Sequence, residues 1–301
     1  MISLYDLING WNYFFFHPEP ASTIGLVRIF IGICSFLNAL WLVSKCHWYF
    51  GPDGFFGTKF IKNSIYDTER LNIFRYLPKS VKYVYLVMIL LLLFSLSLTV
   101  GWHTRLSSIV VYILTTSLNH RNLYMFHSGD TVLRILLFLL MFSRAGDGLS
   151  IDCYLNGKNM LYTMGEPWVE RLMMIQICTV YAYTGWLKIC SEPWVNGSAS
   201  FYPLFLDSYK NFKVPDLLKK TPWVQIATWL TLLIEEMNAF TIWIRELRYV
   251  SLVSGILLHC VFAYCLRLEL FGFVMMCGAL LFIRPEDLSR WLEELCRIIG
   301  L

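Results

Sequence analysis

Charged residues are scarce in this chain of 301 residues: only 15% are Asp, Glu, Lys or Arg. A soluble domain carries about a quarter charged residues, so the composition argues against a soluble globular protein. Residues 1–21 contain no Lys or Arg, which argues against a cationic, removable signal peptide. The formal net charge of +4 is small and dispersed, and it gives no reason to expect a nucleic-acid partner.

Several chemical signatures are also missing. The nine cysteines form no CxxC pair and no Cys/His cluster with zinc spacing, so no metal is predicted. The chain has no HExxH motif, Walker loop, nucleophile elbow or DxDxDG calcium loop. No inverted repeat is visible, which makes a transporter the weakest functional hypothesis. Of the cysteines, only Cys46 and Cys153 are expected to reach an aqueous face.

Long apolar stretches dominate what remains, with 57% hydrophobic and 17% aromatic residues. A helix needs roughly 20 apolar residues to cross a bilayer, and backbone polar groups in lipid must be satisfied internally. We therefore predict an all-α, polytopic integral membrane helix bundle of about eight spans. The expected spans are 22–43, 83–101, 106–120, 126–143, 169–190, 223–244, 249–266 and 269–284.

The C-terminal segment has a different pattern. Pro285 is followed by two acidic residues, the signature of a helix first turn. Apolar residues then recur at helical spacing from Leu288 to Ile299, which predicts a short amphipathic helix lying on the membrane. No separate soluble domain is expected.

Polar residues in the expected spans recur at helical spacing, so each set shares one helix face. Five spans thus present a polar stripe, which predicts a shared hydrated or ligand-filled interior. The stripes are Gly25, Arg28, Gly32 and Ser35; His127, Asp130 and Arg134; Tyr181, Gly185 and Lys188; Thr228, Thr231, Glu235 and Asn238; and Ser251, Gly255 and His259.

Lys188 is the most informative of these residues. A buried lysine has a lowered pKa and becomes a proton acceptor at neutral pH. A neutral amine beside histidine in an apolar, aromatic-rich cavity suits proton abstraction from a phenol or hydroquinone. The competing interpretation is that Lys188, which lies near the end of its span, reaches outward to the headgroups.

The other polar residues have simpler alternatives. Arg28 or Arg134 paired with Glu235 or Glu236 would only hold helices together, and Asp130 would orient a neighbour. For His127 and His259, a core histidine and a site histidine remain equally open.

Short sequence blocks in a fixed order resemble the HTTM (horizontally transferred transmembrane) family, which includes the vitamin K-dependent γ-glutamyl carboxylase. The resemblance extends over nearly the whole chain and implies a single transmembrane domain over residues 1–301. The blocks are Gly25-Leu-Val-Arg28-Ile, Tyr49-Phe-Gly-Pro-Asp-Gly54, Gly101-Trp-His-Thr-Arg105-Leu-Ser, His127-Ser, Leu149-Ser-Ile-Asp152, Tyr183-Thr-Gly-Trp-Leu-Lys188, Trp194-Val-Asn-Gly197, His259-Cys260 and Leu270-Phe-Gly-Phe273.

The resemblance implies a function. In the carboxylase, a membrane-embedded lysine deprotonates vitamin K hydroquinone, and reaction with oxygen then yields a strong base that activates a peptide glutamate. By this resemblance Lys188 is the base and His127 its oxyanion partner, with His259 as a third catalytic candidate. The polar residues Arg28, Asp130, Arg134, Tyr181 and Glu235 are candidates for holding the quinol.

The expected enzyme is embedded in membrane lipids, in a bacterial cytoplasmic membrane, and uses a reduced quinone to modify a secreted peptide, protein or small substrate. The carboxylase has a large extramembrane domain after its last span that grips a propeptide, which this sequence lacks. Processive carboxylation of a propeptide-bearing substrate is therefore not expected. The alternative is a non-catalytic membrane partner or maturation factor for a secreted, toxin-type peptide.

Overall fold

The computed structural model describes residues 3–55, 71–206, 215–266 and 268–300. The chain forms two compact units. The first comprises Met1–Glu170 and Arg284–Leu301, and the second comprises Arg171–Ile283. Both are built from helices, which confirms the all-α prediction, and the only strands in the described residues are the short pair β1 (Glu19–Pro20) and β2 (Met164–Gly165).

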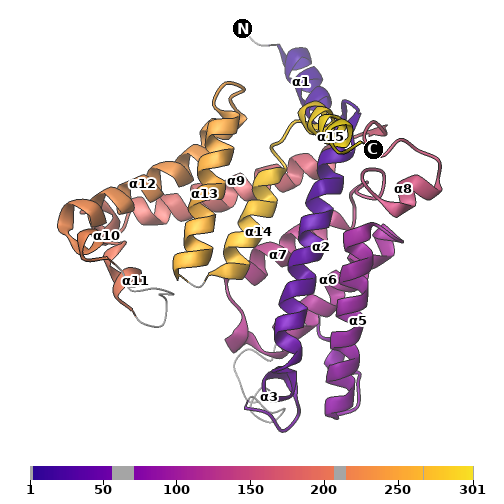
Figure 1. Cartoon of the computed structure of the whole chain (residues 1–301), viewed down its shortest axis with the longest axis horizontal. Helices are drawn as coiled ribbons and strands as arrows, with labels where there is room; N and C mark the ends of the chain where they lie inside the picture. The colour runs from indigo at the N-terminus through magenta and orange to yellow at the C-terminus, as the bar shows by residue number, and fades with distance from the viewer. Residues whose placement is uncertain (1–2, 56–70, 207–214, 267, 301) are drawn as a thin grey trace. The chain divides into compact units, whose positions relative to one another are not determined.

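The helices of the first unit come from both ends of the chain (Figure 1). They are α1 (Leu4–Phe16), α2 (Ser22–Val43), α3 (Cys46–Phe50), η1 (Ile73–Arg75), α5 (Val81–Val100), α6 (Thr104–Arg121), η2 (Leu123–Met125), α7 (Ser128–Leu140), α8 (Ile151–Leu155) and α15 (Pro285–Ile299). The first residues of α9 (Trp168–Ile189) also belong to this unit.

Helix α2 packs closely against α5 in the first unit (Figure 1). Gly32 makes this possible, because a Cβ atom there would lie 2.8 Å from the backbone nitrogen of Thr99. The α2 stripe of Gly25, Arg28, Gly32 and Ser35 is buried, as its spacing predicts.

The C-terminal helix α15 is anchored at the N-terminal end of α2. The hydroxyl of Ser22 donates to the carbonyl of Pro285, and the hydroxyl of Ser289 donates to that of Ser22, both at 3.3 Å. Pro285 occupies the first turn of the helix, as predicted. The residues Trp291, Leu295 and Ile299 are exposed and leave an apolar face uncovered within the described chain.

The second unit contains the remaining helices. Besides most of α9, they are α10 (Glu192–Val195), α11 (Phe201–Phe205), η3 (Asp216–Lys219), α12 (Thr221–Phe240), η4 (Thr241–Trp243), α13 (Arg248–Leu266) and α14 (Glu269–Leu280). Small residues again mark close approaches between helices. Gly255 of α13 faces the side chain of Asn238 on α12, and Gly278 of α14 faces Ile177 of α9.

Helices occupy all eight segments where spans are expected. Three of them are long and apolar enough to cross a membrane, namely Ser22–Val43, Val81–Val100 and Arg248–Leu266. The helix Glu269–Leu280 is apolar but shorter. The membrane character is therefore supported, and the count of eight spans stays a prediction.

The prediction for two cysteines is wrong. Cys46 and Cys153 are both buried, with exposed fractions of 0% and 1%, whereas Cys190, Cys260 and Cys296 are exposed. Cys46 lies where α3 packs on α5, and Cys153 lies inside the connection between α7 and α9. Proximity to a loop in the sequence therefore does not place a thiol in water.

Candidate functional site

Lys188 forms an ion pair with Glu235 in the second unit. The lysine lies at the end of α9, and the glutamate lies on α12. Their side chains are 21% and 7% exposed, so the pair is largely removed from solvent. The ammonium also lies 4.7 Å from the ring centre of Trp194, within range of a cation–π contact. The Lys188 side chain thus points to partners inside the unit. A lysine that reached outward would instead point to the lipid headgroups.

A second polar pair is more deeply buried. The Tyr181 hydroxyl and His259 Nε2 are 2.7 Å apart and form a hydrogen bond between α9 and α13. Tyr181 is 3% exposed and His259 is 1% exposed. The rings of Phe262 and Phe271 meet the imidazole edge to face, which makes its surroundings apolar. His259 Nδ1 is buried and has no hydrogen-bond partner among the described residues.

The sequence stripes explain why these two pairs are neighbours. Tyr181 and Lys188 are seven residues apart on α9, so they share one face of that helix. The charge of Glu235 acts on the Tyr181 hydroxyl, and the charge of Lys188 acts on the His259 imidazole. The structure therefore brings Lys188, Glu235, Tyr181 and His259 into one cluster, which we call the α9–α12–α13 cluster.

Glu236 is a further member of this cluster, although the sequence alone predicts for it only an ion pair that holds two helices together. Its Oε1 atom lies over Gly185 of α9, at a position where any larger residue would collide with it. This oxygen is buried and without a hydrogen-bond partner among the described residues. The charges of Glu235 and Lys188 both act on Glu236. The sequence signal for Glu236 was Gly185 in the predicted α9 stripe, because a glycine at that position indicates the close approach of another helix.

Arg28 belongs to the first unit, where it has a structural partner. Its side chain is fully buried, and Nη2 donates to the carbonyl of Leu149 at 2.7 Å. The guanidinium lies against Gly101, whose left-handed backbone (φ 73°) ends α5. Arg28 therefore holds the segment after α7 onto α2, and Glu235, its predicted partner, is paired with Lys188.

His127, Asp130 and Arg134 also lie in the first unit, on or beside α7. His127 is the N-cap: its Nδ1 accepts from the Gly129 amide, while Asp130 accepts from the His127 amide. The His127 side chain is 52% exposed, and its Nε2 lies 3.4 Å from Asp130. Arg134 contacts His120 Nε2 at 3.0 Å, and His120 lies outside the predicted polar stripes. These residues start and brace α7, and only Asp130 is buried.

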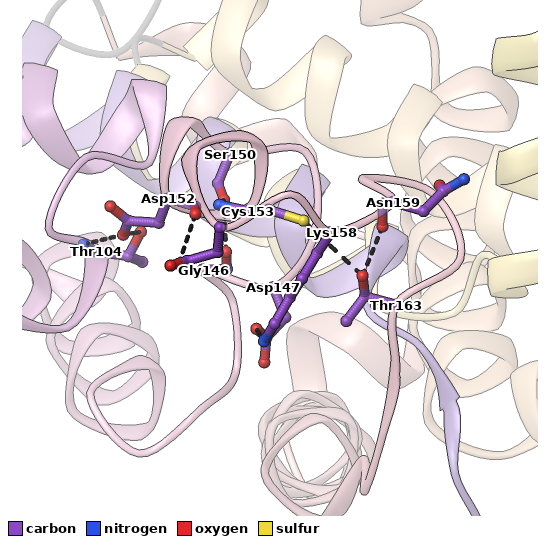
Figure 2. Close-up of polar contacts among 10 residues, drawn as sticks. Thr104, Gly146, Asp147, Ser150, Asp152, Cys153, Lys158, Asn159 and Thr163 are labelled. Atoms are coloured by element: carbon purple, nitrogen blue, oxygen red, sulfur yellow. Dashed lines mark hydrogen bonds and ion pairs between the residues drawn. The ribbon is translucent and has the colours of Figure 1, made fainter.

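The connection between α7 and α9 contains a further polar network, shown in Figure 2. Asp152 caps α6: its oxygens accept from the His103 amide (2.8 Å) and from the amide and hydroxyl of Thr104 (both 2.7 Å). Partial burial raises the pKa of Asp152, but the hydrogen bonds from Thr104 and His103 outweigh it and leave the pKa below its usual value. Nearby, Lys158 Nζ lies 2.7 Å from Asp147 Oδ1, and this contact raises the pKa of Lys158.

Chemically, the α9–α12–α13 cluster offers an amine, two carboxylates, a phenol and an imidazole in a mainly apolar setting. These groups accept and donate protons, and two of their polar atoms lack partners within the described chain. Such a set suits binding of a ligand with hydroxyl groups and transfer of its protons.

Comparison with known proteins identifies relatives. A family model of the HTTM domain matches residues 16–287. The protein called "Uncharacterized protein YitO" of Bacillus subtilis (strain 168) is 22% identical over 198 residues, which is 62% of this chain and 63% of that protein. The match thus spans less than two thirds of the relative's length. No solved structure matches the chain significantly.

Proposed function

Since the chain belongs to the HTTM family, and hence is a membrane protein related to the carboxylase membrane domain, we propose that it is a quinol-dependent membrane enzyme. It would use a lipid quinol and oxygen to modify a peptide or a small substrate, with Lys188 as the base. The observation that carries the proposal is the buried ion pair of Lys188 and Glu235 beside the Tyr181–His259 pair.

The residues of the α9–α12–α13 cluster fit a quinol. A quinol has an aromatic ring and hydroxyl donors, and the cluster has the rings of Trp194, Phe262 and Phe271 together with partnerless atoms. His259 Nδ1 can contact a quinol in either tautomer of the imidazole. Without a proton, Nδ1 accepts a hydrogen bond from a quinol hydroxyl; with a proton, it donates one to the quinol oxyanion. When bound, the quinol supplies reducing equivalents for reaction with oxygen.

The ion pair supports the proposed role of Lys188 as a base. A charged ammonium cannot take up a proton, but the pair is neutral overall whether its proton lies on Nζ or on Glu235. Desolvation penalises two ions more than two neutral partners, so transfer of that proton to the Glu235 carboxylate is least costly in a dry site. The resulting neutral amine can accept a phenolic proton at Nζ. By resemblance to the carboxylase, His127 is the proposed oxyanion partner.

The test is quinol oxidation by the purified, reconstituted protein, followed by absorbance with a short-chain naphthoquinol under air. General acid–base catalysis contributes about 10²–10⁴-fold, so Lys188→Met should reduce turnover at least a hundredfold. Lys45→Met is the matched control, because Lys45 of the first unit also lies over a tryptophan ring, 3.7 Å from Trp41. Equal turnover by the wild type and Lys188→Met would remove Lys188 from the mechanism.

The remaining parts of the proposal concern the setting. We expect a multi-pass protein of a bacterial cytoplasmic membrane that acts on a secreted peptide or protein. His127→Ala should also slow quinol oxidation if the oxyanion role is right. A wild-type protein that turns over no quinol but retains a co-expressed secreted peptide would favour the non-catalytic maturation factor.

A further inference from the structure

A cavity of about 480 Å³ lies in the first unit, separate from the α9–α12–α13 cluster. Its size is within the range of about 300–1,000 Å³ that is usual for small-molecule sites. It is formed where α6 begins and where the connection after α7 folds back. Its polar lining includes His103, Arg105, Arg144, Asp147, Asp152 and Asn156, and its apolar lining includes Leu106 and Leu140.

The position of this cavity relative to α5 indicates its depth in a membrane. Helix α5 is one of the candidate spans, and it ends at Val100. Trp102 follows and is 51% exposed, which is typical of the aromatic belt at a membrane–water interface. His103 and Arg105, which line the cavity, come directly after it in the chain. With α5 as a membrane span, the cavity lies at the level of the lipid headgroups.

The positive side of the cavity is available for an anion. Arg105 is exposed, and no acidic side chain of the described residues pairs with it. Arg144, by contrast, is held by the Glu19 carbonyl at 2.6 Å and by Glu170. The amides at the start of α6 are already bound by Asp152, so recognition of an anion falls to the side chains of Arg105 and His103. A phosphate is the anion found at this depth.

The negative side of the cavity is only partly neutralised. Both oxygens of Asp152 accept hydrogen bonds from the start of α6, as Figure 2 shows for Thr104. Asp147 uses Oδ1 for Lys158, which leaves Oδ2 outside that ion pair. Asn156 donates its amide to the Asp152 carbonyl, so its own side-chain oxygen remains an acceptor. These acceptors suit a primary ammonium, which has three N–H donors, better than a quaternary one, which has none.

We propose that this cavity binds the phosphoethanolamine headgroup of a bilayer lipid. The phosphate is bound by Arg105 and His103, and the ammonium is bound by Asp147 and Asn156. The exposed side chain of Leu106 extends the site toward the acyl chains. A purely anionic headgroup fits less well, because the two carboxylates of the lining would repel it.

The test measures binding of soluble, short-chain lipids to the full-length protein in detergent by native mass spectrometry. The probes are dihexanoyl phosphatidylethanolamine, the corresponding phosphatidylcholine and phosphatidylglycerol, and glycerophosphoethanolamine without acyl chains. We expect phosphatidylethanolamine to bind about tenfold more tightly than each of the others, since one charge-assisted contact is worth about that factor. Equal binding of phosphatidylcholine or phosphatidylglycerol would overturn the assignment of the headgroup. Equal binding of glycerophosphoethanolamine would overturn its assignment to a bilayer lipid.

Variants locate the binding within the cavity. Arg105→Gln should weaken phosphatidylethanolamine binding about tenfold, whereas Arg297→Gln, which removes an exposed arginine from α15, should not. Asp147→Asn should abolish the preference over phosphatidylcholine, and Lys158→Gln, which breaks the same ion pair but keeps the carboxylate, should preserve it. Unchanged binding by Arg105→Gln and Asp147→Asn with unaltered melting temperatures would show that the lipid binds elsewhere.

Discussion

The ion pair of Lys188 and Glu235 allows a sharp prediction for stability. Glu235→Gln removes the negative partner but keeps the shape of the side chain and one acceptor oxygen. Removal of one partner from a buried pair costs about 3–5 kcal/mol, because the remaining charge is left uncompensated. Lys188 is 21% exposed and also contacts the Trp194 ring, which offsets part of the loss. We therefore expect Glu235→Gln to lower the free energy of unfolding by about 2–3 kcal/mol.

A double-mutant cycle separates the pair from its surroundings. Lys188→Met and Glu235→Met should each destabilise the protein, but the double variant leaves no buried charge and should recover most of the loss. The expected coupling energy is about 2 kcal/mol, measured by unfolding in mixed detergent micelles. The control is the same cycle on Asp147 and Lys158, which form an exposed pair with side chains 35% and 47% accessible. Such a pair is worth about 0.2–1 kcal/mol.

One result would refute this reasoning. If the coupling between Lys188 and Glu235 is no larger than that between Lys158 and Asp147, the first pair is not in a low-dielectric site. Lys188 would then behave as an ordinary surface lysine. The proposed proton shift from Nζ to the Glu235 carboxylate, on which the proposed base role of Lys188 depends, would lose its physical reason.

Three further predictions concern other parts of the chain. Gly32→Ala should destabilise the protein by about 2 kcal/mol or more, because a Cβ would meet the α5 backbone, whereas Gly10→Ala, with open space around it, should be neutral or slightly stabilising in thermal unfolding. Tyr181→Phe should cost about 1–3 kcal/mol in the same assay by leaving His259 Nε2 unpaired in an apolar site, and a smaller loss would mean that water reaches the imidazole. The pKa of Asp152 is depressed in the folded state, so the stabilising effect of its carboxylate is complete above the unfolded pKa of about 3.9 and is lost as the pH falls below that value. Asp152→Asn should therefore flatten the dependence of stability on acid pH. An unchanged slope of stability against pH would contradict the capping role of Asp152.

Helical spacing was sufficient to predict which face of α2, α12 and α13 is buried. The stripe of Thr228, Thr231, Glu235 and Asn238 is wholly buried, and so is that of Ser251, Gly255 and His259. Spacing says nothing about partners, because these depend on residues far away in the chain. The pairing of Glu235 with Lys188 is such a case. It joins residues 47 positions apart, and neither stripe alone identifies it.

His127 shows where span prediction fails. Hydropathy places it inside an expected span at 126–143, but the helix begins at Ser128 and leaves His127 as its exposed N-cap. The signal was present in the sequence, since an acidic residue three positions after a hydrogen-bonding residue is the pattern of a capping box. Asp130 fills that position and accepts from the His127 amide. Local capping interactions therefore set the start of α7, and hydropathy averaged over about twenty residues does not detect them.

The buried polar atoms that lack a partner decide between a structural and a functional interpretation of the polar stripes. Arg28 Nε and Nη1 are without hydrogen-bond partners in the described chain, but the guanidinium lies against Gly101, where even one added carbon would collide with Nη1. His259 Nδ1 and Glu236 Oε1 instead belong to the α9–α12–α13 cluster, which also contains the Lys188 amine and the Tyr181 phenol. An unsatisfied buried polar group costs about 1–3 kcal/mol, so a ligand that donates hydroxyl protons to both atoms would recover that energy on binding. An apolar ligand of the same shape would not, and hydroxyl groups should therefore dominate recognition in the second unit.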